Sequence, residues 1–358
     1  MPLARMLRLI WPTTRPRPAS RRPRRPAISR PAAQRTIASR EGWLPWLLTP
    51  TTPAFTPDTL RANPLALLLM AACLVVQVVA RYQFGFLYDE RWLAVHLLIA
   101  FTASFSILVW FHGTAWLKRV SPQSWLVLVS GALCFCGFWY LGRVDSWRRW
   151  FQPWVDPSFP MAPLWSFFYF SASGVFFRMV LPLLFARRFL GLRPRDLGVL
   201  PSSGSASAPH RLWPLYLAAF LIVLPFVIHA AGTPAFLRKY PLCHDLLASA
   251  SIPVWQFVLY QVAYVFVFVS GESFWRGYLT FGTERDFGMY AIALMIIPYV
   301  TAHFGKPLPE TLGAILAGSV LGYLALKHRS VWLGVAVHYG VALTMDLLAL
   351  YGRGVVLT

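Results

Sequence analysis

The chain has 358 residues, of which 57% are hydrophobic and 13% are charged, and its formal net charge is +20 at pH 7. This composition excludes an ordinary soluble domain and predicts an integral membrane protein. Long apolar runs separated by short polar breaks predict spanning helices, because the strands of a β-barrel would be short and alternating. We therefore expect an all-α, polytopic helical membrane protein with about eight to nine transmembrane helices.

The positive charge is concentrated at the start of the chain. Residues 1–62 hold twelve arginines but only two acids, Glu41 and Asp58, and so carry half of the net charge. This stretch is rich in Pro, Arg, Ser and Thr and lacks apolar periodicity, which predicts a disordered, basic cytoplasmic tail. An organellar transit peptide is the alternative, since the start is Arg-rich and poor in acids. The remaining basic residues lie mainly between apolar runs, so nucleic acid is not an expected partner.

Nine apolar segments follow the tail, and we expect each of them to cross the membrane. The eighth segment carries Ala314, Gly318 and Gly322 at four-residue intervals, a spacing that lets helices approach closely. The nine segments lie at residues 64–79, 92–117, 125–141, 163–185, 212–231, 256–277, 288–304, 309–326 and 331–351.

The loop charges predict the orientation of these segments, because cytoplasmic loops carry an excess of Lys and Arg. With the tail in the cytoplasm, the loops on its side hold Lys118, Arg119, the cluster at residues 187–195, Arg285, Lys327 and Arg329. The loops on the far side hold Arg81, Arg91, Arg143, Arg148, Arg149, Arg238, Lys239 and Lys306. We predict a multi-pass protein of a bacterial inner membrane with a cytoplasmic N-terminus.

Two full charges occur in the sixth segment, which reads QFVLYQVAYVFVFVSGESFWRG. Glu272 and Arg276 are spaced i and i+4 with the acid first, the better order for a helical ion pair. An ionisable side chain inside a span is costly and is by default functional. The alternative is an ion pair that only locks helices together. A second arginine, Arg178, lies in the fourth segment, where we expect a structural counter-charge to Asp346 or Glu272.

Two later segments add further ionisable groups. The seventh ends with Tyr299 and His303, and the ninth contains His338 and Asp346. Counted along the helices at 1.5 Å per residue, Glu272, His303 and His338 lie at overlapping depths of roughly 12 to 24 Å. We therefore expect these three side chains to meet in one cavity that opens toward the cytoplasmic face.

A carboxylate beside two imidazoles is suited to hydrolysis. Glu272 would take a proton from water, His303 would orient the water, and His338 would bond the oxyanion of an attacked peptide carbonyl. The same three groups form a possible zinc ligand set. Because they come from three helices and no HExxH pair is present, we favour chemistry without a metal or other cofactor and keep zinc as the alternative.

The residues around these groups resemble motifs of the CPBP family, membrane-embedded proteases that include type II CAAX prenyl endopeptidases and bacteriocin-processing enzymes. The first family motif has two glutamates, three residues, then Arg and commonly Gly, and GESFWRG matches its second glutamate, Glu272, with Arg276 and Gly277. The second motif, an aromatic residue followed four positions later by His, is matched by Tyr299 and His303.

The third family motif is a histidine with an asparagine four residues later, and His338 matches its histidine. Asp346, eight residues after His338, and the phrase LRPRDLG at residues 192–198 are also similar to the family. Two positions depart from it, because Gly271 stands for the first glutamate and Ala342 for the asparagine. These departures leave Glu272 as the only base of the first motif and remove one expected oxyanion donor.

The resemblance implies a protease domain at residues 251–358, preceded by transmembrane helices at residues 63–250 and the tail at 1–62. It implies an intramembrane endopeptidase with Glu272, His303 and His338 as catalytic residues and Arg276, Asp346 and Tyr299 as supporting ones. Its partners would be membrane lipid and a peptide or protein substrate. The competing hypothesis is a non-catalytic membrane scaffold or binding protein with the same fold. A transporter is a third hypothesis. It is not favoured, because the segments show no inverted repeat.

Overall fold

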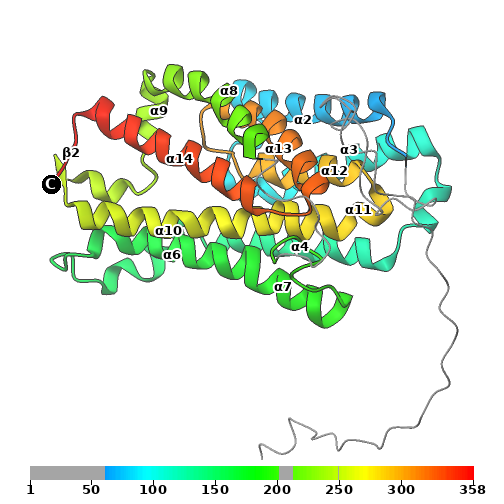
Figure 1. The fold of residues 1–358 in the computed structure, drawn as a ribbon, viewed down its shortest axis with the longest axis horizontal. Coiled ribbons are helices and arrows are strands. Elements are labelled where there is room, and N and C mark those ends of the chain that lie inside the picture. The colour runs from blue at the N-terminus through cyan, green and yellow to red at the C-terminus, as the bar shows by residue number, and fades with distance from the viewer. Residues whose placement is uncertain (1–60, 201–212, 249) are drawn as a thin grey trace, which may run out of the picture. The chain divides into compact units, whose positions relative to one another are not determined.

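The computed structural model describes residues 61–200, 213–248 and 250–358, all within one compact unit of the chain, Thr51–Thr358. Most of these residues are helical, and the fold is that of an all-α polytopic membrane protein (Figure 1). The tail predicted at residues 1–62 falls almost wholly outside the described residues. The division at residues 250 and 251 stays a prediction.

Eight helices in the described part of the chain are long and apolar enough to cross a membrane. Four precede residue 200: α2 (Pro64–Phe84), α3 (Leu93–His112), α4 (Pro122–Leu141), and a continuous helix made of α6 (Ala162–Val175), η6 (Phe176–Val180), α7 (Leu181–Phe185) and η7 (Ala186–Leu190). Four follow: α8 (Trp213–Ala231), a continuous helix made of α10 (Val254–Glu272), η10 (Ser273–Phe281) and α11 (Gly282–Phe287), then α13 (Leu308–His328) and α14 (Trp332–Arg353).

The remaining elements are short. The strands β1 (Ser251–Ile252) and β2 (Val356–Leu357) pair in parallel. The segment directly before α10 is thus hydrogen-bonded to the segment directly after α14. The short helices are α5 (Val144–Trp150), α9 (Pro234–Lys239), α12 (Tyr290–Thr301), η3 (Glu90–Trp92), η4 (Ala115–Lys118), η5 (Gln152–Trp154) and η9 (His244–Ala248).

The seventh predicted segment is shorter than expected. It forms α12, whose 12 residues extend about 18 Å, less than the hydrocarbon thickness of about 30 Å. The chain nevertheless reaches both ends of α2. The hydroxyl of Tyr290, the first residue of α12, accepts a hydrogen bond from the backbone N–H of Asn63, and the Tyr82 hydroxyl donates to the carbonyl of Lys306. The side chain of Tyr290 and the turn that follows α12 therefore extend the reach of this short helix.

The loops gather at two ends of the helical bundle, which we name by their lysines. At the Lys118 end, the backbone N–H and the hydroxyl of Ser121, directly before α4, donate hydrogen bonds to the carboxylate of Asp286 in α11. At the Lys306 end, the hydroxyl of Tyr240 bonds the carboxylate of Glu310. The helices run between these two ends, and the two predicted groups of basic loop residues lie at opposite ends. The predicted division of the basic loop residues into two groups is therefore confirmed.

Close helix packing follows the row of small residues in α13. A Cβ atom at Gly318 would lie 2.9 Å from the ring of Tyr299, and one at Gly322 would lie 2.8 Å from Ile292. Larger residues at these positions would push α12 away from α13. The prediction that this row allows close approach is confirmed, and it fixes the helix that carries Tyr299.

The long sixth helix is widened where it passes the charged residues. Residues Ser273–Phe281 form π-helical turns, a feature found frequently at functional sites. Within them, Gly277 lets the loop of the LRPRDLG phrase approach, because a Cβ there would lie 2.9 Å from the carbonyl oxygen of Leu197. That loop thereby supports the helix directly after Arg276.

The arrangement predicts which loops share a side of the membrane. In a protein whose four native cysteines are replaced, single cysteines at Arg119, Arg195 and Ser330 should react with a membrane-impermeant reagent from one side of sealed vesicles. Cysteines at Asp156 and Lys306 should react from the other side. We expect the first side to be cytoplasmic. Labelling of Lys306 and Ser330 from the same side would show that α13, which lies between them, does not cross the membrane.

Candidate active site

Glu272, the last residue of α10, is a buried carboxylate with two charged or polar partners. Its Oε1 atom lies 2.6 Å from Nη1 of Arg276 and 3.0 Å from Nδ1 of His338, and its side chain is 1% exposed. Because a carboxylate accepts hydrogen bonds, Nδ1 of His338 carries a proton and donates a hydrogen bond to Glu272. The predicted helical ion pair is present, and Glu272 also joins α10 to α14.

A glycine of α14 makes room for this carboxylate. A Cβ atom at Gly334 would lie 2.8 Å from Oε2 of Glu272. Gly334 is one turn before His338, so the two residues share a face of α14. The sequence analysis did not single out Gly334, since a glycine in a membrane helix is common and its partner on another helix cannot be read from spacing.

Arg276 is enclosed between Glu272 and an aromatic ring. Its side chain is 0% exposed, and its guanidinium carbon lies 4.6 Å from the centroid of the Tyr299 ring. Among the described residues, Nε and Nη2 have no hydrogen-bond partner. The charge of Arg276 is therefore balanced mainly by Glu272, and Tyr299 adds a cation–π contact.

His303 lies in the turn after α12. Its Nδ1 atom is 2.8 Å from the carbonyl oxygen of Tyr299, which can only accept, so Nδ1 carries the proton and Nε2 is the acceptor of the neutral ring.

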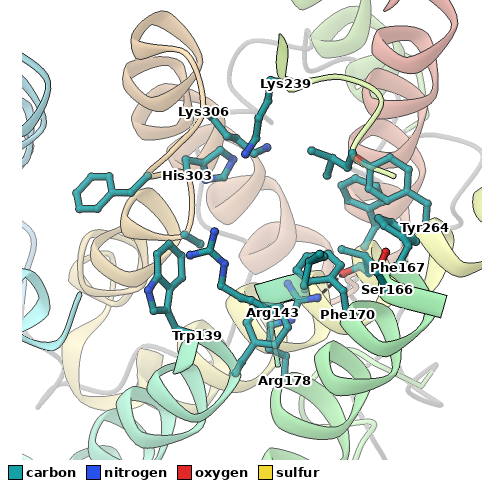
Figure 2. A pocket seen from close by; sticks show the side chains of 18 of the residues that line it. Trp139, Arg143, Ser166, Phe167, Phe170, Arg178, Lys239, Tyr264, His303 and Lys306 are labelled. Atoms are coloured by element: carbon teal, nitrogen blue, oxygen red, sulfur yellow. Dashed lines mark hydrogen bonds between the residues drawn. The ribbon is translucent and has the colours of Figure 1, made fainter. Parts of the chain in front are cut away.

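His303 and His338 line the same cavity, which has a volume of about 310 Å³. Figure 2 shows this cavity, with His303 labelled. Tyr299 and Trp275 also line it, whereas Glu272 lies behind His338. The structure thus brings the three predicted catalytic residues into one neighbourhood. Two of them face the cavity, and the third reaches it through a hydrogen bond to His338.

The cavity reaches the Lys306 end of the bundle, where its lining includes Arg148 of α5 and His244. The expectation that it opens on the side of the basic tail was therefore wrong. Toward the Lys118 end the bundle is filled by large buried rings of η10, among them Phe274 and Tyr278, both 0% exposed. The three side chains lie near one another as expected, but side-chain packing decides which end is open.

Asp346 supports the same two helices at another level. Its Oδ2 atom accepts hydrogen bonds from the hydroxyl of Tyr260 at 2.7 Å and from the amide of Gln261 at 2.9 Å. Asp346 lies eight residues, or about 12 Å, beyond His338 along α14. It therefore joins α14 to α10 without contacting the histidines.

Arg178 does not have the role expected from the sequence. Its Nη2 atom donates to the carbonyl of Val267 at 3.2 Å and to the hydroxyl of Ser270 at 3.0 Å. In the described part of the chain, no carboxylate lies within 4.0 Å of its guanidinium, and both Asp346 and Glu272 are bonded elsewhere. The prediction of a structural counter-charge was wrong, because Arg178 lies on the opposite face of α10 from Glu272.

The two departures from the family motifs lie in different surroundings. Gly271 lines the cavity, and a Cβ atom there would lie 3.5 Å from Nε1 of Trp275 and 3.6 Å from Nη1 of Arg178. Ala342 is 5% exposed and belongs to the apolar core that includes Phe268. The first glutamate position of the motif therefore faces the cavity, whereas Ala342 is packed among apolar side chains.

The lining also contains basic residues that the sequence analysis did not assign to the site: Arg143, Arg148, Lys239 and Lys306. The loop-charge analysis placed all four on one side of the membrane. Nothing in their spacing indicated that they converge on one cavity, because they come from three separate loops.

The described residues contain no group of three or more His, Cys, Asp or Glu side chains arranged to hold a metal ion. His303 and His338 line the cavity, but the carboxylate of Glu272 is already bonded to Arg276 and to Nδ1 of His338. A zinc site of these three residues would require that carboxylate to turn from Arg276 toward the cavity. Metal-free chemistry remains our prediction.

The buried ion pair predicts a strong dependence of stability on both partners. Arg276→Ala should lower the free energy of unfolding by about 3–5 kcal/mol, because it leaves a buried carboxylate uncompensated. The double variant Glu272→Gln with Arg276→Gln should recover part of this loss in thermal unfolding of the detergent-solubilised protein. As a control, Lys306→Ala in the pair with Glu310, whose side chains are 22% and 23% exposed, should cost at most about 1 kcal/mol. Additive losses in the cycle would show that Glu272 and Arg276 are not coupled.

Gly334 provides a test that needs no substrate. Gly334→Ala should destabilise the protein by about 1–3 kcal/mol, because the added methyl group meets a carboxylate held by two hydrogen bonds. The matched control is Gly313→Ala in α13, where an added Cβ meets no atom within 4 Å and should stabilise the helix by up to about 1 kcal/mol. Equal effects of the two substitutions on the unfolding temperature would refute the proposed fit of Glu272 against Gly334.

Comparison with known families places the site residues in one matched segment. Residues 253–344 match the family model described as type II CAAX prenyl endopeptidase Rce1-like. Neither a curated protein nor a solved structure matches the chain. The matched segment runs from the start of α10 into α14 and contains Glu272, His303 and His338. Within residues 253–344 the chain is therefore similar to CAAX-type membrane proteases, and the residues of the motifs lie around one cavity.

Proposed function

We propose that this protein is a membrane-embedded endopeptidase that activates water with imidazole and carboxylate groups. The observation that carries the proposal is the hydrogen bond from His338 to the buried Glu272, beside a cavity that His303 also lines. A carboxylate that holds one nitrogen of an imidazole fixes its tautomer and leaves the other nitrogen free to take a proton.

His338 would take the proton from the attacking water. With Nδ1–H donated to Glu272, the Nε2 atom of the neutral ring is an acceptor, and the carboxylate stabilises the imidazolium that forms. The same imidazolium can return the proton to the departing amine. Glu272 is then a positioning residue that acts through His338, and its direct role as the base, expected from the sequence, is replaced by this relay.

His303 would hold the water from the other side. Its Nδ1–H is bonded to the carbonyl of Tyr299, so Nε2 accepts from the second hydrogen of the water. Two acceptors from different helices fix the position of one nucleophile, and such orientation is a major part of rate enhancement.

The basic lining of the cavity would stabilise the oxyanion. Arg143, Lys239 and Lys306 line it, and positive charge in a site shielded from water favours a developing negative charge. This contribution would compensate in part for the asparagine that Ala342 replaces.

The likeness to CAAX-type proteases and the apolar helices imply a peptide substrate reached within a lipid bilayer. If the basic tail is cytoplasmic in a bacterial inner membrane, as we propose, the cavity faces the opposite side of that membrane. A substrate would then be a membrane-anchored peptide whose cleavage site lies near the extracytoplasmic surface.

A non-catalytic scaffold is the second candidate, and the surroundings of Ala342 favour it. An apolar residue packed in the core at the position of an oxyanion donor is consistent with a site that retains its fold without its chemistry. The ion pair of Glu272 and Arg276 would then serve packing alone.

Enzyme and scaffold differ in the products they leave. Membranes of cells that express the wild-type protein should contain new peptide N-termini, detected by mass spectrometry, that are lost with His338→Ala or His303→Ala. On a synthetic peptide spanning such a site, Glu272→Gln should reduce the cleavage rate by about a thousandfold or more, because the carboxylate no longer stabilises the imidazolium. The control Glu310→Gln removes another paired acid near the cavity and should retain most of the activity.

Identical sets of N-termini from wild type and Glu272→Gln would favour the scaffold. One zinc per purified chain by elemental analysis, lost in His303→Ala, would instead replace the imidazole–carboxylate mechanism by a metal-dependent one.

A further inference from the structure

Arg178 is a buried cation without an acidic partner. Its side chain lines the cavity, and the residue is 7% exposed. Among the described residues, its Nε atom has no hydrogen-bond partner. A buried charge that is not compensated costs several kcal/mol, so a purely structural role would be filled better by an apolar residue.

The surrounding chain holds the guanidinium in one place. The side chain folds back over Gly174, four residues earlier, where a Cβ atom would lie 2.5 Å from Nη2. One face of the guanidinium stacks on Phe138, with 4.4 Å between its carbon and the ring centroid. The carbonyl of Val267 and the hydroxyl of Ser270 accept hydrogen bonds from Nη2. Nη1 is left beside Gly271, which lines the cavity.

The other cations of the lining are mostly balanced. Arg143 pairs with Glu90, Arg148 with Asp245, and Lys306 with Glu310. In the described chain, Arg178 and Lys239 of this lining have no carboxylate within 4.0 Å. One further acid of the lining, Asp145, lies on α5 at the Lys306 end. In the view of Figure 2, Arg178 lies on the side of the cavity opposite His303 and Lys306.

We propose that Arg178 binds a carboxylate of the substrate, either a free C-terminus or an acidic side chain. The proposal rests on the proposed peptidase function and adds the substrate class. A guanidinium presents parallel N–H groups that match a planar carboxylate, and such charge-assisted bonds are strongest where water is excluded. The carboxylate bound on the wall formed by η6 and α10 would place the neighbouring peptide bond toward His303 and His338.

Binding of short peptides to the purified, full-length protein tests this without turnover. Three probes are compared by isothermal titration in detergent: acetyl-Leu-Val-Ala with a free C-terminus, acetyl-Leu-Asp-Ala amide, and acetyl-Leu-Asn-Ala amide, which has no carboxylate. At least one acidic probe should bind about tenfold more tightly than the asparagine amide. The acidic probe that shows this preference identifies the source of the carboxylate.

The preference should fall to about twofold or less in Arg178→Gln and survive in part in Arg178→Lys. Gly271→Glu offers a route that keeps the arginine, because it places an internal carboxylate beside Nη1 and should abolish the preference. Arg148→Gln is the charge-matched control, since Arg148 lines the cavity but is already paired with Asp245, and this variant should keep the preference.

Equal binding of the three probes to the wild type would overturn the proposal, and so would an unchanged preference in Arg178→Gln or Gly271→Glu. Loss of the preference in Arg148→Gln to the same extent would also overturn it, because general positive charge would then explain the binding. Since no bond is broken in these titrations, a failure of the peptidase proposal would leave their outcome interpretable on its own.

Discussion

The ion pair of Glu272 and Arg276 is the interaction on which the rest of the site depends. Two opposite charges, both almost fully buried, are tolerable inside a membrane protein only because each compensates the other. Their contacts join the helix formed by α10 and η10 to two others: Arg276 lies against Tyr299 of α12, and Glu272 bonds His338 of α14. The pair thus sets the relative positions of the helices that carry both imidazoles.

A second buried arginine shows the opposite arrangement. The charge of Arg276 is balanced within the fold, whereas Arg178 lacks a carboxylate in the described chain and faces the cavity. In our proposals the balanced pair supports the chemistry and the unbalanced arginine supports recognition. The two functions are separated by α10, because Gly271 and Glu272 are consecutive and point to different faces of that helix. A single helix can therefore serve the catalytic groups on one side and the substrate on the other.

Much of the fold and part of the site followed from the sequence alone. The apolar segments determined the helices, since a backbone in hydrocarbon must satisfy its own hydrogen bonds. Spacing within one helix determined the pairing of Glu272 with Arg276, because i and i+4 residues are neighbours on a helix. The row of small residues that includes Gly318 determined the close packing of α13. Loop charges grouped the basic residues by side.

Only the tertiary structure decided how the helices are rotated and which spaces between them are filled. Spacing could not show that Glu272 lies behind His338, that Gly334 makes room for it, or that Arg178 is unpaired, since these depend on contacts between helices. It also could not show that the cavity opens at the Lys306 end. That outcome depends on the large rings of η10 that fill the other end, and the volume between helices is set by side chains from several of them at once.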